Sequence, residues 1–266
     1  MVSALRELGF DRVFDTVFGA DLTIVEEASE LLERIKDGGP FPLITSCCPS
    51  WIMMMEHFYP ELRENVSTCK SPHEMLGSLA KSYFAENEGT DSEDITVVSV
   101  MPCISKKYEA SRKEMEKDVD YVITTRELAR MIEEDSLNFD ELGDGEFDDP
   151  LGISTGAGKI FGVTGGVMEA ALRTAADRMG EEIEFSLESV RGNDGIKKGE
   201  ITLDGRKIKF AVAHGGANIQ SVVSDIEDEE IHFVEFMACP GGCIGGGGQP
   251  KSDDPDILEK RASSLY

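Results

Sequence analysis

The segment IHFVEFMACPGG, residues 231–242, is an apolar run that passes directly into a loop containing a cysteine. Two other segments have the same form: PLITSCC at 42–48 and VVSVMPC at 97–103. Each pattern predicts a buried strand that ends in a loop. Ligands in α/β folds bind beyond the carboxyl ends of the strands. We therefore expect cysteines from three distant parts of the chain to converge on one site.

Helical patterns alternate with these strands. Residues 21–36 place apolar side chains at three- and four-residue spacing, which is typical of an amphipathic helix. Helices are also expected at 72–86, 125–134 and 166–179, and one more strand at 207–215. The acidic, turn-rich residues 133–150 predict a solvated surface segment. This alternation predicts an α/β fold with largely parallel sheets.

Composition excludes several classes of partner. The 266 residues include 26 Lys plus Arg and 52 Asp plus Glu, which gives a net charge of −26. Such a chain lacks the cationic surplus that nucleic acids and anionic membranes attract. No apolar stretch reaches the roughly 18 residues of a spanning helix, and the first residues do not form a signal peptide. We predict a cytoplasmic protein that neither binds nucleic acid nor inserts into a membrane.

The six cysteines favour metal binding over disulfides. They are few, unevenly spaced and partly adjacent, in a chain with no export signal, and a reducing cytosol keeps such thiols free. Cys239 and Cys243 form a C-x3-C pair in a loop with six glycines between residues 239 and 248. With Cys48 and Cys103 they supply four thiolates, which suits a 4Fe-4S cluster better than zinc, although inert core thiols remain an alternative.

Three motifs together resemble one family, the active-site domain of the iron-only (FeFe) hydrogenases. They are TSCCPSW at 45–51, MPC at 101–103 with Lys106 and Glu109, and EFMACPGGC at 235–243 running on to GQP at 248–250. The resemblance covers residues 2–266. It implies two lobes with largely parallel sheets flanked by helices, and an active-site cluster in the cleft between them.

The resemblance also implies a cofactor, the H-cluster. This is a 4Fe-4S cubane joined through one cysteine sulfur to a two-iron subsite with CO, cyanide and an amine-containing dithiolate bridge. Carried over by motif, the cubane ligands are Cys48, Cys103, Cys239 and Cys243, with Cys243 as the bridging residue. Lys106 is expected to contact a cyanide ligand. The remaining pocket residues implied are Ser46, Met101, Pro102, Phe161 and Met237.

A proton route follows from the same resemblance. It runs from the thiol of Cys47, which faces the bridge amine, through Glu27, Ser67 and Glu30 to Arg34 near the surface. By spacing alone, Glu27, Glu30 and Arg34 share one helical face, and that spacing favours a surface ion-pair face over a proton route. Cys69 is interpreted as a buried cysteine that is not a ligand. The three histidines with an interpretable setting, His57, His73 and His214, are given structural roles.

The implied activity is reversible H2 oxidation and proton reduction. Its partners are an external electron carrier, either ferredoxin-like or an iron–sulfur subunit, and maturation proteins that supply the two-iron unit. Two alternatives stay open: an H2-sensing module without turnover, and an iron–sulfur assembly relative, which is expected to lack the paired cysteines or Lys106. Family members normally have residues before this start, so residues 1–266 are interpreted as one H-cluster domain, incomplete at the beginning of its first lobe. No accessory ferredoxin-like domain is expected.

Overall fold

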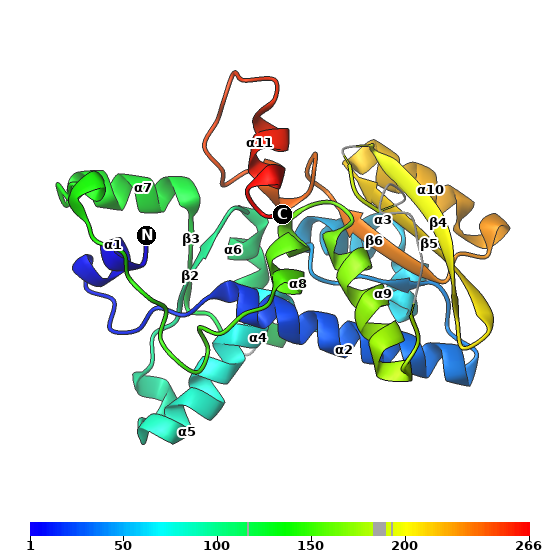
Figure 1. The fold of residues 1–266 in the computed structure, drawn as a ribbon, viewed down its shortest axis with the longest axis horizontal. Helices are drawn as coiled ribbons and strands as arrows, with labels where there is room; N and C mark the ends of the chain where they lie inside the picture. Colours follow the sequence, from blue (N-terminus) through cyan, green and yellow to red (C-terminus); the bar gives the residue numbers. More distant parts are fainter. Residues whose placement is uncertain (116, 183–189, 193) are drawn as a thin grey trace.

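Two separate β-sheets organise the chain in a computed structural model, which describes residues 1–115, 117–182, 190–192 and 194–266. The larger sheet has the strand order β1-β6-β5-β4, and the smaller one pairs β2 with β3 (Figure 1). The strands are β1 (Leu43–Ile44), β2 (Val98–Met101), β3 (Tyr121–Thr124), β4 (Ile196–Leu203), β5 (Arg206–His214) and β6 (Phe233–Met237). Two sheets flanked by helices confirm the predicted α/β class.

Among the strands of the described residues, three of the four pairings are parallel. β1 pairs with β6, β6 with β5, and β2 with β3 in parallel, whereas β5 and β4 form an antiparallel hairpin. The strand β4 was missing from the sequence prediction. The sequence does carry a signal for β4, the pair Asp204-Gly205 that follows it. Both residues have positive φ in the structure, at 52° and 67°. An Asp-Gly pair between alternating residues is typical of such a hairpin turn.

Helices cover both faces of the larger sheet. On one face, α2 (Thr16–Asp37) and α9 (Gly166–Met179) pack against Leu43, Phe210 and Phe233. On the other face, α3 (Pro49–Phe58) and α10 (Gly216–Glu229) pack against apolar side chains of the sheet. Their apolar partners there include Ile44, Ala211, Ala213, Val234 and Phe236. Successive strand residues point to opposite faces, so both faces of β6 are buried.

The smaller sheet belongs to a second lobe, on the left in Figure 1. Its helices are α1 (Val2–Glu7), α6 (Ser105–Ala110) and α7 (Thr125–Glu134). Ala4, Leu128 and Ile132 form a core with residues of both strands. Thr124 caps α7 by accepting from the backbone N–H of Glu127, whose side chain accepts in return from the Thr124 amide. This reciprocal cap explains why the predicted helix 125–134 begins where it does.

The predicted helix boundaries agree with the structure at 125–134 and 166–179. The helix expected at 21–36 begins earlier, at Thr16, because the Asp15 side chain accepts from the Val17 amide, with an N–O distance of 3.0 Å. The segment 72–86 is helical but changes type along its length: α4 (Pro72–Leu79), a π-helical stretch (Ala80–Phe84) and α5 (Ala85–Glu88).

Short helices and turns complete the described part of the chain. The α-helical ones are α8 (Gly156–Lys159) and α11 (Ile257–Ser263). The 3-10 turns are Pro60–Asn65, Ser92–Asp94, Lys113–Met115, Phe139–Glu141, Ile160–Gly162 and Cys243–Gly245. Among the residues described, none of the helices combines the length and apolarity needed to cross a bilayer.

The core around β6 sets a first prediction. Phe236 is fully buried and its ring packs edge-on against Trp51, with 4.5 Å between ring centroids. Replacing Phe236 by Ala should lower the free energy of unfolding by about 3–5 kcal/mol, because it leaves a cavity. The matched control is Phe58→Ala, since Phe58 is 71% exposed. Denaturant unfolding that shows equal effects for the two variants would contradict this account of the core.

Candidate active site

Three cysteine-bearing loops meet between the two lobes. Cys48 is the N-cap of α3 after β1, Cys103 follows β2, and Cys239 follows β6. Backbone hydrogen bonds tie the loops together: the Ala238 amide donates to the Cys48 sulfur at 3.4 Å, and the Gly248 amide donates to the Pro102 carbonyl at 2.8 Å. The convergence predicted from the three strand-and-loop segments is therefore confirmed.

The four thiols predicted as ligands influence one another electrostatically. Burial raises the pKa of Cys48, Cys239 and Cys243, and the neighbouring cysteines, Cys103 among them, raise it further. Four thiols gathered in this way cannot all ionise unless a cation offsets their charge. The donor set therefore fits a positively charged metal group.

The arrangement of the cysteine sulfurs can be compared with the geometry of a single zinc ion. Within the described part of the chain, no three cysteine sulfurs lie within 4.8 Å of one another. A tetrahedral zinc ion, with Zn–S bonds of about 2.3 Å, would hold its sulfurs roughly 3.8 Å apart. The described sulfurs are therefore not arranged as a preset tetrahedral zinc site.

Glycines let the loop after Cys239 pack closely around this site. Gly242 has φ of +93°, and a Cβ there would lie 2.7 Å from the Met237 sulfur and 2.8 Å from the Thr164 nitrogen. A Cβ on Gly248 would lie 2.8 Å from the Pro102 carbonyl carbon and 3.0 Å from the Cys103 nitrogen. Any side chain at either position would force the loops apart. The glycine-rich sequence is thus required by the approach of backbone to backbone.

Cys47 lies in an apolar environment. It is 8% exposed and packs in one cluster with Phe161 and Met237, two of the three residues predicted to form the apolar wall. Met101 belongs to a different cluster, with Val119 and Val122. Burial raises the pKa of the Cys47 thiol well above its usual range, and the nearby Glu27 raises it further. The thiol therefore holds its proton in this structure.

A buried cation lies beside Cys47. Lys106 is 7% exposed, and its Nζ donates to the Cys47 carbonyl at 3.0 Å and to Glu109 Oε2 at 2.7 Å. Burial alone would lower the pKa of Lys106, but the Glu109 carboxylate outweighs it and raises that pKa above its ordinary value. Lys106 is therefore a fixed positive charge, well suited to an anionic ligand.

The structure adds titratable groups that the sequence analysis treated as structural or did not consider. His73 donates from Nε2 to Glu109 Oε2 at 2.7 Å, and both side chains are buried together with Glu74. Its neighbour Glu74 is another buried carboxyl group. The sequence signals were the i, i+3 spacing of Lys106 and Glu109 and the His-Glu pair at the start of α4.

Of the other histidines, exposed His57 bonds to the Met53 carbonyl, and His214 accepts from the Gly241 amide at 3.1 Å.

Glu27 is fully buried, and neither of its carboxyl oxygens has a hydrogen-bond partner among the described residues. Burial raises its pKa to about 8, and the negative charge of Glu30 adds to the rise. The Ser67 hydroxyl lies near enough to offset the shift in part. A carboxyl group in such surroundings can take up and release protons near neutral pH.

The outer part of the expected route is hydrogen-bonded. Ser67 Oγ donates to Glu30 Oε2 at 2.9 Å, and Arg34 donates to Glu30 Oε1 at 2.7 Å. Arg34 was expected near the surface, but it is only 8% exposed. Its guanidinium is held inside by the carbonyl oxygens of Pro40, Asn65 and Val66. Arg34 is therefore largely covered, because backbone carbonyls supply its partners, and its place at the end of the proton route stays a prediction.

A hollow of about 290 Å³ gives access to this region. Ser46, Ser67, Cys69 and Glu109 are among its lining residues. Cys69 is half-buried here, not buried as expected, because it lies on the wall of the hollow. Its carbonyl accepts from Ser46 Oγ at 2.6 Å.

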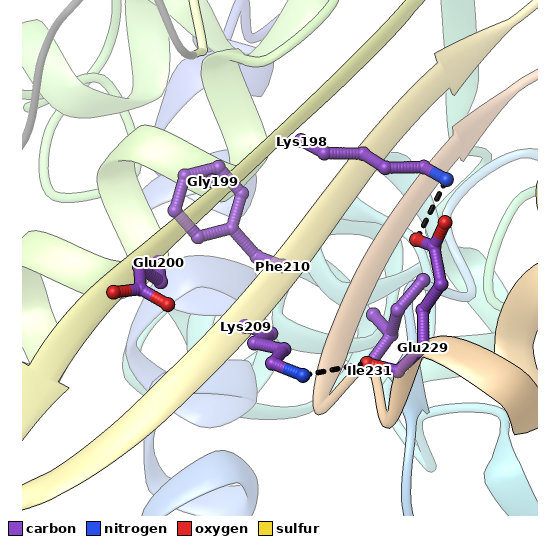
Figure 2. Close-up of a pocket in the computed structure, with 7 residues that line it drawn as sticks. All are labelled: Lys198, Gly199, Glu200, Lys209, Phe210, Glu229 and Ile231. Carbon is purple, nitrogen blue, oxygen red and sulfur yellow. Dashed lines mark hydrogen bonds and ion pairs between the residues drawn. The ribbon is translucent and has the colours of Figure 1, made fainter.

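A second hollow lies at the edge of the larger sheet, where Lys198 and Lys209 bond to Glu229 (Figure 2), and none of the cysteine loops lines it.

Comparison with known proteins agrees with this geometry. A family model described as the C-terminal domain of the iron-only hydrogenase large subunit matches residues 1–247. The chain belongs to this family. It is 49% identical over 279 residues to iron hydrogenase 1 of Clostridium pasteurianum, covering 99% of this chain and 48% of that protein. It is 48% identical to the periplasmic [Fe] hydrogenase large subunit of Nitratidesulfovibrio vulgaris, covering 97% of this chain and 63% of that protein.

The fold of the chain also matches solved structures. A variant of the [FeFe]-hydrogenase HydA1 from Chlamydomonas reinhardtii superimposes with a TM-score of 0.87 at 43% identity. The alignment covers 100% of this chain and 76% of that one. The domain is also 33% identical to the cytosolic Fe-S cluster assembly factor narfl of Xenopus tropicalis, over 100% of this chain and 60% of that protein. The chain spans about half to two-thirds of the length of these curated relatives.

The buried carboxyl group of Glu27 sets a second prediction. Its folded-state pKa of about 8 exceeds the ordinary value of 4.5, so between these pH values only the unfolded chain releases the proton. The wild-type protein should therefore lose stability as pH rises through this window. Replacing Glu27 by Gln removes that loss, so the stability difference between variant and wild type should grow by on the order of 3 kcal/mol from pH 5 to 8.

The matched control for Glu27→Gln is Glu26→Gln, because Glu26 is the exposed neighbour on the same helix. Urea unfolding at several pH values measures both variants. A pH-independent difference for Glu27→Gln, or the same pH dependence for Glu26→Gln, would refute the assignment of a proton to Glu27.

Proposed function

We propose that this domain catalyses reversible H2 oxidation and proton reduction at an H-cluster. The observation that carries the proposal is the pairing of two features in one place. Four converging thiols can hold a cluster, and a fifth, buried thiol lies beside a carboxyl group that is open to protonation. A cluster site used only for electron transfer or structure has no need of the second feature.

The chain's own residues fit the cofactor that the family implies. Cys48, Cys103, Cys239 and Cys243 would hold the 4Fe-4S part, and Cys243 would be shared with the two-iron subsite bearing CO, cyanide and the amine-containing dithiolate. When bound, this group supplies the redox chemistry that makes and splits the H–H bond. The protein contributes ligands, an apolar enclosure, a fixed cation and a path for protons.

Proton movement is the part of the reaction that the side chains perform. Cys47 Sγ holds a proton in its apolar pocket and exchanges it with Glu27, the buried carboxyl group whose charge acts on this thiol. When Glu27 is protonated it donates toward Ser67, whose hydroxyl already points its own proton at Glu30. This orientation suits outward transfer, because Ser67 can accept from one side while it donates on the other. Arg34 stabilises the Glu30 carboxylate that receives the proton.

The pocket residues control charge and water. Lys106, whose ammonium group is held by the Cys47 carbonyl and Glu109, would offer its positive charge to an anionic cyanide ligand. Phe161 and Met237 keep water from the Cys47 thiol, since all three pack in one apolar cluster. Ser46 and Pro102 from the neighbouring loops, and Met101 at the end of β2, would complete the proposed pocket. The Pro102 carbonyl is bonded to the glycine-rich loop.

Catalysis is favoured over the two alternatives. The adjacent cysteines at 47 and 48 and the buried Lys106 are both in place, which argues against a role confined to iron–sulfur assembly. The linked Ser67, Glu30 and Arg34 argue against a sensor that senses H2 without turnover.

Electron exchange requires a partner. Cys103 and Cys239 are partly exposed, so a cluster bound there would lie near the surface. We propose an external ferredoxin-like carrier or an iron–sulfur subunit as partner, and maturation proteins for the two-iron unit, in the cytoplasm. A net charge of −26 would repel an acidic carrier, so its association should strengthen as salt is added.

Replacing Cys47 by Ala tests the proton-carrying thiol. We expect the anaerobically matured variant to lose H2 evolution from reduced viologen by at least a hundredfold, since general acid–base groups contribute about 10²–10⁴ in rate. Its iron content should equal that of the wild type, because Cys47 is not a ligand. Substantial activity in Cys47→Ala, or loss of iron, would contradict this role.

The assignment of ligands is tested by iron quantification after reconstitution. Cys239→Ala should lose the absorbance and the iron of the 4Fe-4S cluster, because three thiolates hold a cubane poorly. Cys69→Ala is the matched control, since Cys69 is another partly buried cysteine, outside the four-thiol group. Equal iron content in the two variants would refute the assignment.

A further inference from the structure

A second cluster of titratable groups lies next to Lys106. His73 and Glu74 lie in the first turn of α4, and Glu109 lies on α6. Their relative exposures are 3%, 0% and 4%. Glu109 Oε2 accepts three hydrogen bonds, and its donors are Lys106 Nζ at 2.7 Å, His73 Nε2 at 2.7 Å and Ser71 Oγ at 3.0 Å. One carboxylate oxygen therefore joins the lysine to the histidine.

The protonation states of this cluster follow from its contacts. Lys106 and His73 lower the pKa of Glu109 to about 2, against the opposing effect of burial, so its carboxylate is ionised. His73 must then donate from Nε2, which leaves Nδ1 to accept from Ser99 Oγ at 3.1 Å. Burial lowers the pKa of His73 to about 4, so the ring is neutral with a single tautomer. Both ring nitrogens are thus fixed.

This arrangement is a hydrogen-bond network and not an ion site. The ligand atoms of His73, Glu74 and Glu109 do lie within 4.8 Å of one another. However, Glu109 Oε2 already accepts three hydrogen bonds, and one donor is an ammonium group. A divalent cation at this point would have to displace Lys106 or lie against its positive charge.

We propose that His73 is a positioning residue for Lys106: through Glu109, it holds the ammonium group at the Cys47 carbonyl. The lysine side chain has four flexible carbons and its charge needs a fixed partner. Glu109 can be that partner only if its own carboxylate cannot rotate. The ring of His73, fastened by Ser99, locks it. The inference rests on the proposed function in one respect only, which is that the group facing Lys106 is a cyanide ligand of the H-cluster.

Glu74 completes the network by staying neutral. Neither of its oxygens has a hydrogen-bond partner within the described residues, although Oε1 lies 3.3 Å from His73 Nε2. Burial raises its pKa to about 8, and the negative charge of Glu109 contributes to the rise. An ionised Glu74 would compete with Glu109 for the histidine N–H. With Glu74 protonated, Glu109 remains the one anion that His73 and Lys106 share.

The test compares His73→Leu with His73→Gln in the full chain without metal. A glutamine amide can replace the Nε2 donor, and leucine cannot. The measurement is ¹⁵N-lysine NMR of the Lys106 ammonium group, assigned with a Lys106→Met variant. We expect a slowly exchanging signal in wild type and His73→Gln, and at least tenfold faster proton exchange with water in His73→Leu. Exposed His57→Leu is the control, and thermal melting shows whether each variant is folded.

Unchanged exchange in a folded His73→Leu variant would overturn the proposal. If the His73→Leu variant does not fold, the test rests on His73→Gln. In that variant the proton exchange of the Lys106 ammonium group must match that of the wild type. A second readout uses the loaded protein, where the cyanide stretching bands should shift in His73→Leu and not in His73→Gln. Failure to load the H-cluster would count against the proposed function and leave the NMR result intact. A last measurement adds Co²⁺ and records the absorption that the ion shows when it is bound by N and O ligands. If this absorption is present in wild type and lost in His73→Leu, the cluster is an ion site and the proposed hydrogen-bond network is wrong.

Discussion

The rest of the structure depends on gathering four thiols that cannot all be ionised together without a cation. Burial and mutual repulsion raise the pKa of Cys48, Cys239 and Cys243. The fold encloses these four thiols because strands of both sheets end at one place. β6 contributes most, because both of its faces are buried and its loop carries two of the cysteines. Loading a metal cluster should therefore stabilise the whole domain.

The surroundings of the thiols follow from the same constraint. Glycines bring two loops into backbone contact around the site, and Lys106 adds a fixed positive charge beside Cys47. On the other side, burial raises the pKa of Glu27 more than its neighbours Ser46 and Ser67 lower it. The site thus joins a charged, hydrogen-bonded side, with Lys106 and Glu109, to a side where protons can move. The proposed proton reduction would use both sides.

Much of this could be predicted from the sequence. The strand-and-cysteine segments located the site, because parallel strands bring distant loops to one edge. Apolar periodicity identified the long helices, and β4 was missed although Asp204 and Gly205 mark its turn. The sequence could not show that Arg34 is buried or that Cys69 is half-exposed. Those facts depend on backbone carbonyls and on a hollow that form only when distant segments pack. The His73 network was missed for the same reason: its partners lie on another helix and on β2.

Infrared spectroscopy of the anaerobically matured protein tests the central claim most directly. CO and cyanide ligands absorb where the protein itself does not, so they report the two-iron unit without any assay of turnover. The account predicts distinct CO and cyanide bands together with the iron of a 4Fe-4S cluster. A full cluster complement without those bands, obtained under conditions that mature a known FeFe hydrogenase, would contradict it.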